Sequence, residues 1–184
     1  GYCGGVVDNI LMRIADIFLA FPGIVFAIAV ASVLSGGITS AVIAVAAVSW
    51  PKYARLARSE VLSVCASDYI KAARMSGMSE FGIIIKHIIP NIAGIIVTTA
   101  LLDIGHMMME IAGLSFLGLG AAPPAAEWGA MMSNGRSMLQ TAPWIILAPG
   151  VAIFVSVLIF NMFGESVKTR WNKNNRRTGY AGRQ

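Results

Sequence analysis

Two long stretches without an ionisable side chain constrain this chain more than any other feature of its sequence. No Asp, Glu, Lys, Arg or His occurs from Ile17 to Pro51, or from Ser137 to Gly164. A helix needs about 20 mainly apolar residues to cross a bilayer, so the first stretch can supply two spans and the second one. With 57% hydrophobic and 12% charged residues, the composition departs from that of soluble globular domains. The sequence therefore predicts an all-α integral membrane protein.

We predict four membrane spans, with helices over residues 6–34, 38–58, 91–117 and 144–167. Pro22-Gly23 should kink the first helix, and Ser35-Gly36-Gly37 should separate it from the second. With this arrangement most of the 14 Lys and Arg residues fall on one side of the membrane. The positive-inside rule then places the polar segment 61–90 and the basic tail 168–184 in the cytoplasm of a multi-pass protein. The +5 net charge is thus explained by topology and lipid contact, without a nucleic-acid partner.

The polar segment 61–90 is unusual between membrane-grade stretches. Ser67 or Asp68 can cap a short helix over residues 69–76, and Gly77 can end it in the left-handed conformation. Ser79 can cap a second short helix that carries Phe81 and stops before Pro90. Two short helices meeting at a glycine form a compact knob that a soluble partner could hold. A loop lying on the bilayer surface fits the same residues equally well.

The spacing of Ala72-Ala73, Gly77 and Pro90 resembles the "EAA" loop of binding-protein-dependent ABC importer permeases. Lys71 stands where that family usually has Glu, and His87 stands where Ile is frequent. Further motifs are similar to the second permease subunit of dipeptide, oligopeptide and nickel importers. These motifs are Leu19-Ala-Phe-Pro-Gly23, Trp50-Pro-Lys-Tyr-Ala-Arg55, Leu114-Ser-Phe-Leu-Gly-Leu-Gly120, Glu127-Trp-Gly129 and Thr141-Ala-Pro143.

The resemblance implies a polytopic helix bundle of the ABC permease type in the cell (inner) membrane, with residues 1–167 as its transmembrane domain. Family members usually have six spans, so these four would be the last four. The implied partners are a homologous permease subunit, two cytoplasmic ATPase subunits and an external solute-binding protein. ATP and magnesium would be bound by the ATPases and no cofactor by this chain, which has no Gly-x-x-x-x-Gly-Lys loop. Coupling to the ATPases would fall to Asp68, Lys71, Ala72, Ala73, Gly77, Phe81, His87 and Pro90.

Three ionisable residues interrupt the third predicted span. Asp103, His106 and Glu110 are spaced by three and four residues, so they share one helix face. Charged groups are costly inside a membrane, so we expect them to face a cavity or one another. A structural network, the lining of a translocation path and transient metal ligation all remain open. By resemblance, Asp103 and His106 favour a path for nickel or a nickel chelate, with dipeptides or oligopeptides as the alternative.

Two residues outside the membrane, Glu127 and Trp128, are expected to contact the binding protein. Catalysis has little support in the sequence, because His106-Met-Met-Met-Glu110 is not a His-Glu-x-x-His motif and no Gly-x-Ser-x-Gly motif occurs. We therefore expect a non-catalytic permease. An intramembrane enzyme, or a channel that works without ATPases, is the remote alternative.

Overall fold

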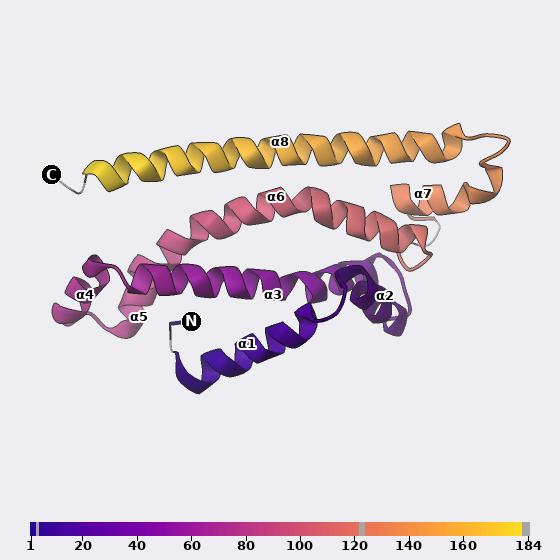
Figure 1. The fold of residues 1–184 in the computed structure, drawn as a ribbon. Helices are drawn as coiled ribbons and strands as arrows, with labels where there is room; N and C mark the ends of the chain where they lie inside the picture. Colours follow the sequence, from indigo (N-terminus) through magenta and orange to yellow (C-terminus); the bar gives the residue numbers. More distant parts are fainter. Residues whose placement is uncertain (3, 122–123, 182–184) are drawn as a thin grey trace. The chain divides into compact units, whose positions relative to one another are not determined.

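The computed structural model describes residues 1–2, 4–121 and 124–181, and all regular elements within them are helical (Figure 1). The prediction of an all-α protein is confirmed. In chain order the elements are α1 (Gly5–Leu19), α2 (Gly23–Val33), α3 (Ile38–Cys65), α4 (Asp68–Met75), α5 (Glu80–Ile83), the π-helix η1 (Ile84–Ile88), α6 (Ile89–Phe116), α7 (Trp128–Asn134), the 3-10 turn η2 (Arg136–Met138) and α8 (Trp144–Ala181).

The chain forms two compact units. The first contains residues 1–20 and 50–99, and the second contains residues 21–49 and 100 onward. The long helices α3 and α6 each contribute residues to both units. The polar segment lies in the first unit, and the interrupted span with Asp103, His106 and Glu110 lies in the second.

Fewer helices than predicted meet the length and composition of a membrane span. Among the described residues, Glu80–Phe116 (37 residues) and Trp144–Arg170 (27 residues) do so, and α1 with α2 adds a third if the pair forms one broken span. The predicted second span, within α3, is not among them. That helix begins only at Ile38, so any stretch of 18 residues within it includes Lys52 and Arg55. These two charges lower its mean hydropathy.

The predicted kink at Pro22-Gly23 is a complete break in the helix. Helix α1 ends at Leu19, and Pro22 is the N-cap of α2 with φ −58° and ψ 125°. A proline disfavours the helical conformation of the residue before it, and its own nitrogen cannot donate a backbone hydrogen bond. The predicted break at Ser35-Gly36-Gly37 is confirmed, since all three residues there have positive φ.

The expected stop before Pro90 is wrong, because the helix passes through this proline. In a regular α-helix the proline ring collides with the carbonyl four residues earlier. Here the turn before it is a π-helix, in which the N–H of Ile89 bonds the carbonyl of Ile84. The side-chain amide of Asn91 also donates to the carbonyl of His87 at 2.8 Å. These bonds let α5, η1 and α6 form one continuous helix.

Small residues bring the helices of the second unit close together. Its core contains five small or branched side chains from α2 and α3, with Leu114 from α6: Ala27, Ala31, Ala41, Ala44 and Val45. Helix α8 crosses α6 at two glycines. A Cβ on Gly105 would lie 3.1 Å from Oδ1 of Asn161, and one on Gly164 would lie 2.9 Å from a methyl group of Leu102. Small residues commonly allow such close approach between membrane helices.

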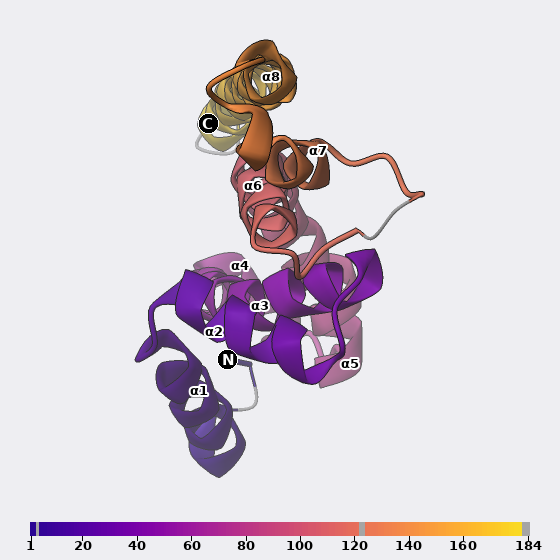
Figure 2. The same ribbon diagram turned by 90° about the vertical axis from the view of Figure 1, so that its right-hand side faces the viewer.

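Residues 118–142, between the third and fourth predicted spans, contain helix α7 and the turn η2. Helix α7 lies beside the end of α6 in both views (Figures 1 and 2). The contact is tight, since a Cβ on Gly129 would lie 2.3 Å from the carbonyl oxygen of Ala112. The guanidinium of Arg136 donates to the carbonyl of Phe116 and lies 3.7 Å from the centre of its ring. Helix α7 and the turn η2 are therefore folded against the end of α6.

We predict that Gly129→Ala destabilises the full-length protein by about 1–3 kcal/mol, because the added methyl group meets backbone atoms that cannot move aside. Thermal unfolding in detergent is the measurement. Gly113→Ala, in α6, is the matched control. No atom lies within 4 Å of its Cβ position, and replacing a mid-helix glycine should add about 0.5–1 kcal/mol. Equal unfolding temperatures for the two variants would contradict the close contact.

Candidate functional site

The polar segment folds as a compact turn of helices, residues 67–90, which we call the elbow. Helix α4 ends at Met75, and Gly77, the residue after its C-cap, has φ +79°. The N–H of Met78 bonds the carbonyl of Ala73 at 3.2 Å, and the N–H of Gly77 bonds that of Arg74 at 3.0 Å. This pair of bonds is the Schellman motif, which requires a left-handed residue at the position of Gly77. The predicted glycine stop is confirmed.

The second arm of the elbow begins as predicted at Ser79. The hydroxyl of Ser79 accepts the N–H of Gly82 at 3.2 Å and so caps α5. Ser67 precedes α4 without such a side-chain bond. The two arms are joined by a small apolar core of fully buried residues, Ile70 from α4, Ile83 from α5 and Ile88 from η1. The elbow is therefore a folded element with its own core.

Several ion pairs lie on the surface of the elbow. The ammonium of Lys71 lies 2.8 Å from Oδ1 of Asp68, one turn earlier on α4, and this hydrogen bond lowers the pKa of Asp68. Arg74 reaches Glu80 across the turn at 3.4 Å, and the hydroxyl of Tyr2 donates to the same carboxylate. The guanidinium of Arg74 also lies 5.6 Å from the centre of the Tyr2 ring. These pairs are solvent-exposed, so each contributes little stability.

Two large apolar side chains project outward from the elbow. Met75 is 89% exposed and Phe81 is 72% exposed, and they flank the Gly77 turn in sequence. Ala72 is also exposed, whereas its neighbour Ala73 packs on the buried core. Sequence reasoning selected Phe81 but missed Met75. The signal was available in the helical period of α4, which places Ile70 and Ala73 on one face and leaves Met75 off it.

The remaining predicted coupling residues lie at the base of the second arm. The ring of His87 is 6.0 Å from that of Tyr69, and the hydroxyl of Tyr69 accepts a hydrogen bond from the Asn91 amide at 3.0 Å. Pro90 is exposed on the helix that continues into α6. The base of the second arm is thus linked to α4 as well as to the span.

The three ionisable residues of the interrupted span are only partly brought together. Nε2 of His106 lies 3.3 Å from Oε1 of Glu110, with the imidazole 68% exposed and the Glu110 side chain 15% exposed. Oε2 of Glu110 is buried without a hydrogen bond to the described residues. Asp103 is half-buried one turn earlier. In the described part of the chain, no group of three or more His, Cys, Asp or Glu residues is placed to hold a metal ion.

The two residues expected to contact a binding protein have different roles in the fold. The carboxylate of Glu127 accepts the N–H groups of Gly129 and Ala130 at 3.0 and 2.8 Å, so it caps helix α7. Trp128 is 40% exposed and lines a shallow pocket with Ala126, Glu127 and Met131.

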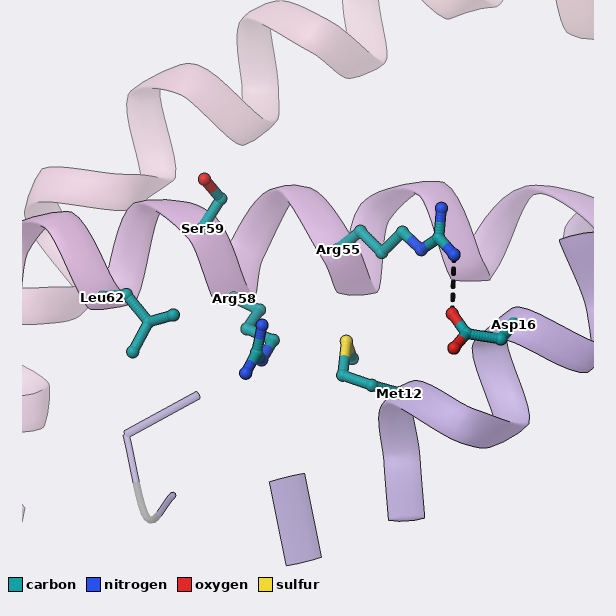
Figure 3. Close-up of a pocket in the computed structure, with 6 residues that line it drawn as sticks. All are labelled: Met12, Asp16, Arg55, Arg58, Ser59 and Leu62. Carbon is teal, nitrogen blue, oxygen red and sulfur yellow. Dashed lines mark hydrogen bonds and ion pairs between the residues drawn. The ribbon is translucent and has the colours of Figure 1, made fainter. Parts of the chain in front are cut away.

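A set of ion pairs between α1 and α3 was missed in the sequence. Arg55 lies 2.6 Å from Asp16, and Arg58 holds the buried carboxylate of Asp8 through its Nε and Nη2 at 2.8 and 2.7 Å. The Arg55–Asp16 pair lies beside a pocket (Figure 3). The paired residues are 39 and 50 positions apart, so no local spacing connects them.

The long apolar helices indicate a membrane protein. Residues 1–173 match the family described as binding-protein-dependent transport system inner membrane component, and the chain belongs to that family.

Known relatives carry several different substrates. The chain is 44% identical over 168 residues to the dipeptide transport system permease protein of Alkalihalophilus pseudofirmus, covering 91% of this chain and 55% of that protein. It is 39% identical over 168 residues to the nickel transport system permease protein of Escherichia coli K12, covering 91% and 61%. For the glutathione transport system permease protein of Pectobacterium atrosepticum the identity is 43% over 168 residues, covering 91% and 56%. The chain thus spans a little over half the length of these relatives.

Burial in the elbow predicts that two apolar residues of α4 contribute very differently to stability. Ile70→Ala should destabilise the full-length protein by about 2–5 kcal/mol, because it empties part of the small core. Met75→Ala should change stability by less than about 0.5 kcal/mol, because that side chain is exposed. Thermal unfolding of the two variants in detergent compares them. A larger effect from Met75→Ala would show that the elbow packs differently.

Proposed function

We propose that this chain is the permease subunit of a binding-protein-dependent ABC importer and forms part of the path for a small polar solute. A homologous permease subunit, two cytoplasmic ATPases and an external solute-binding protein would complete the transporter. The chain itself would not be catalytic, and ATP would be hydrolysed by the partner subunits. Family membership supports the class of transporter.

The elbow is the observation that carries this proposal. It is a rigid projection, held by its own core and by the Gly77 turn, and its exposed Met75 and Phe81 suit insertion into a pocket of a soluble partner. Apolar anchors of this kind supply most of the binding energy at protein interfaces. Because the second arm continues without a break into α6, a displacement of the elbow would be transmitted directly to a membrane-spanning helix.

Substitution of Gly77 tests the coupling role. In Gly77→Val a β-branched residue must adopt φ near +79°, which costs about 1–3 kcal/mol and distorts the turn. We expect uptake by the assembled transporter to be largely lost while the protein still inserts, as measured by transport assays alongside membrane immunoblots.

Gly77→Asn is the matched control for that variant. No atom lies within 4 Å of the Cβ position, so both side chains have room, and asparagine tolerates the left-handed conformation. Uptake should stay close to wild type. If Gly77→Val also transports normally, the geometry of this turn does not couple ATP hydrolysis to transport.

For the cargo we propose nickel as a chelate, with peptides as the alternative. The similarities to dipeptide, nickel and glutathione permeases do not choose between them. Support for nickel comes from the exposed imidazole of His106 beside the carboxylate of Glu110, since nitrogen and oxygen donors suit a divalent transition metal. Two donors are too few to hold a bare ion, so the cargo would arrive with ligands of its own.

Parallel uptake assays decide between these cargoes. His106→Ala should abolish uptake of radioactive nickel and leave uptake of a labelled dipeptide unchanged, because only the metal would use the imidazole. Asp103→Ala tests the neighbouring carboxylate in the same assay. The peptide alternative would be selected if the wild type does not transport nickel and His106→Ala loses dipeptide uptake.

A further inference from the structure

The pocket between α1 and α3 has features that the proposed transport function does not use. It has a volume of about 360 Å³ and is lined by Met12, Asp16, Arg55, Arg58, Ser59 and Leu62, all within the first unit. Figure 3 shows Arg55 extending from α3 to the carboxylate of Asp16 on α1. This volume is within the range of small-molecule sites.

The charge around this pocket is not balanced. Arg13 approaches Asp16 at 3.9 Å, in addition to the pairs that Arg55 and Arg58 make with Asp16 and Asp8. Three guanidiniums therefore share two carboxylates, which leaves one positive charge uncompensated. The pocket consequently favours a ligand with one negative charge.

The two arginines that line the pocket keep donors for such a ligand. Among the described residues, Arg55 bonds through Nη2, and Arg58 bonds through Nε and Nη2. The Nη1 groups are left for a further acceptor. Guanidiniums bind phosphate oxygens strongly, because they offer several donors in a fixed planar arrangement. Neither arginine needs to leave its carboxylate to bind a phosphate.

Besides the charged residues and Ser59, the lining contains two apolar side chains. Met12 and Leu62 form part of the wall, and Ile14 and Ile17 on α1 are exposed beyond it. A ligand that fits the whole surface has an anionic head and a hydrocarbon part. The positive-inside pattern places these arginines near the inner leaflet, where basic pockets bind anionic lipid head groups.

We propose that this pocket binds the phosphodiester of an anionic phospholipid, with Arg55 and Arg58 as its ligands. The phosphodiester of phosphatidylglycerol carries the single negative charge that the ion-pair cluster lacks. Its glycerol and first methylene groups lie against Met12 and Leu62, and its chains follow the exposed apolar face of α1. The bound lipid thereby joins α1 to α3 on the cytoplasmic side.

The test counts phosphatidylglycerol retained by the full-length permease in its assembled transporter. The complex is taken from nanodiscs of phosphatidylcholine with a minor fraction of phosphatidylglycerol, and native mass spectrometry measures the bound lipid. Arg55→Gln should lower retention about fivefold, the effect expected for the loss of one hydrogen bond to the phosphate. Asp16→Asn should raise retention, because it removes a negative charge in the pocket lining that repels the phosphate.

Arg13→Gln is the matched control, since it removes an equal charge from the same ion-pair cluster but does not line the pocket. Its retention should fall less than that of Arg55→Gln, because the variant lowers the charge of the cluster but removes no ligand of the phosphate. Lipid binding predicts that Arg55→Gln lowers lipid retention and that Asp16→Asn raises it. If the two residues formed only a structural ion pair, breaking it from either side would change retention in the same direction. If the Arg55→Gln transporter does not assemble, the lipid retention of Asp16→Asn compared with that of Arg13→Gln still tests the proposal.

Three results would overturn the proposal. Equal retention in all variants would mean that lipid does not bind through these arginines, including the case in which a preceding part of the full-length protein fills the pocket. Equal losses from Arg13→Gln and Arg55→Gln would indicate a diffuse surface attraction. Displacement of the lipid by excess inorganic phosphate would assign the site to a free anion.

Discussion

The constraint on which the rest of this structure depends is that hydrocarbon offers no hydrogen-bond partner to a peptide group. Every backbone N–H and C=O within the membrane must therefore be satisfied by the chain itself. Continuity of the helix from the elbow into the membrane depends on the turn at Pro90, where a π-helical turn and the Asn91 amide replace the bonding that the proline disrupts. The span from Glu80 to Phe116 consequently stays unbroken and links the elbow mechanically to the membrane.

Charged residues are arranged according to the same constraint. In the first unit the carboxylates of Asp8 and Asp16 are paired with arginines on α3, so that α1 and α3 are joined by ion pairs. In the second unit His106 and Glu110 form a pair on α6. Removing one partner of such a pair leaves an uncompensated charge, which is expensive where water is scarce. The pairs between α1 and α3 therefore fix which faces of these two helices meet.

Much of the elbow could be predicted from local chemistry. Gly77 with φ +79° and the Ser79 cap are determined within a few residues of chain, because a left-handed turn needs glycine and a helix start needs an acceptor. The continuation through Pro90 could not be predicted, because it depends on a π turn that carries no clear sequence signal. The helical period of α4 also indicates that Met75 is exposed, although the sequence prediction did not include this residue. The cap that Glu127 forms on α7 was also not predicted.

The sequence by itself determined that the chain is helical, that it enters a membrane and that its helices break at Pro22-Gly23, at Ser35-Gly36-Gly37 and at Gly77. These properties follow from composition, from the absence of charge over long stretches and from the local stereochemistry of glycine and proline. Only the tertiary structure decided that Arg55 and Arg58 meet Asp16 and Asp8, and that Gly129 lies against Ala112. Contacts between residues far apart in the chain depend on how helix faces pack, and packing is a property of neighbours in space that no local pattern encodes.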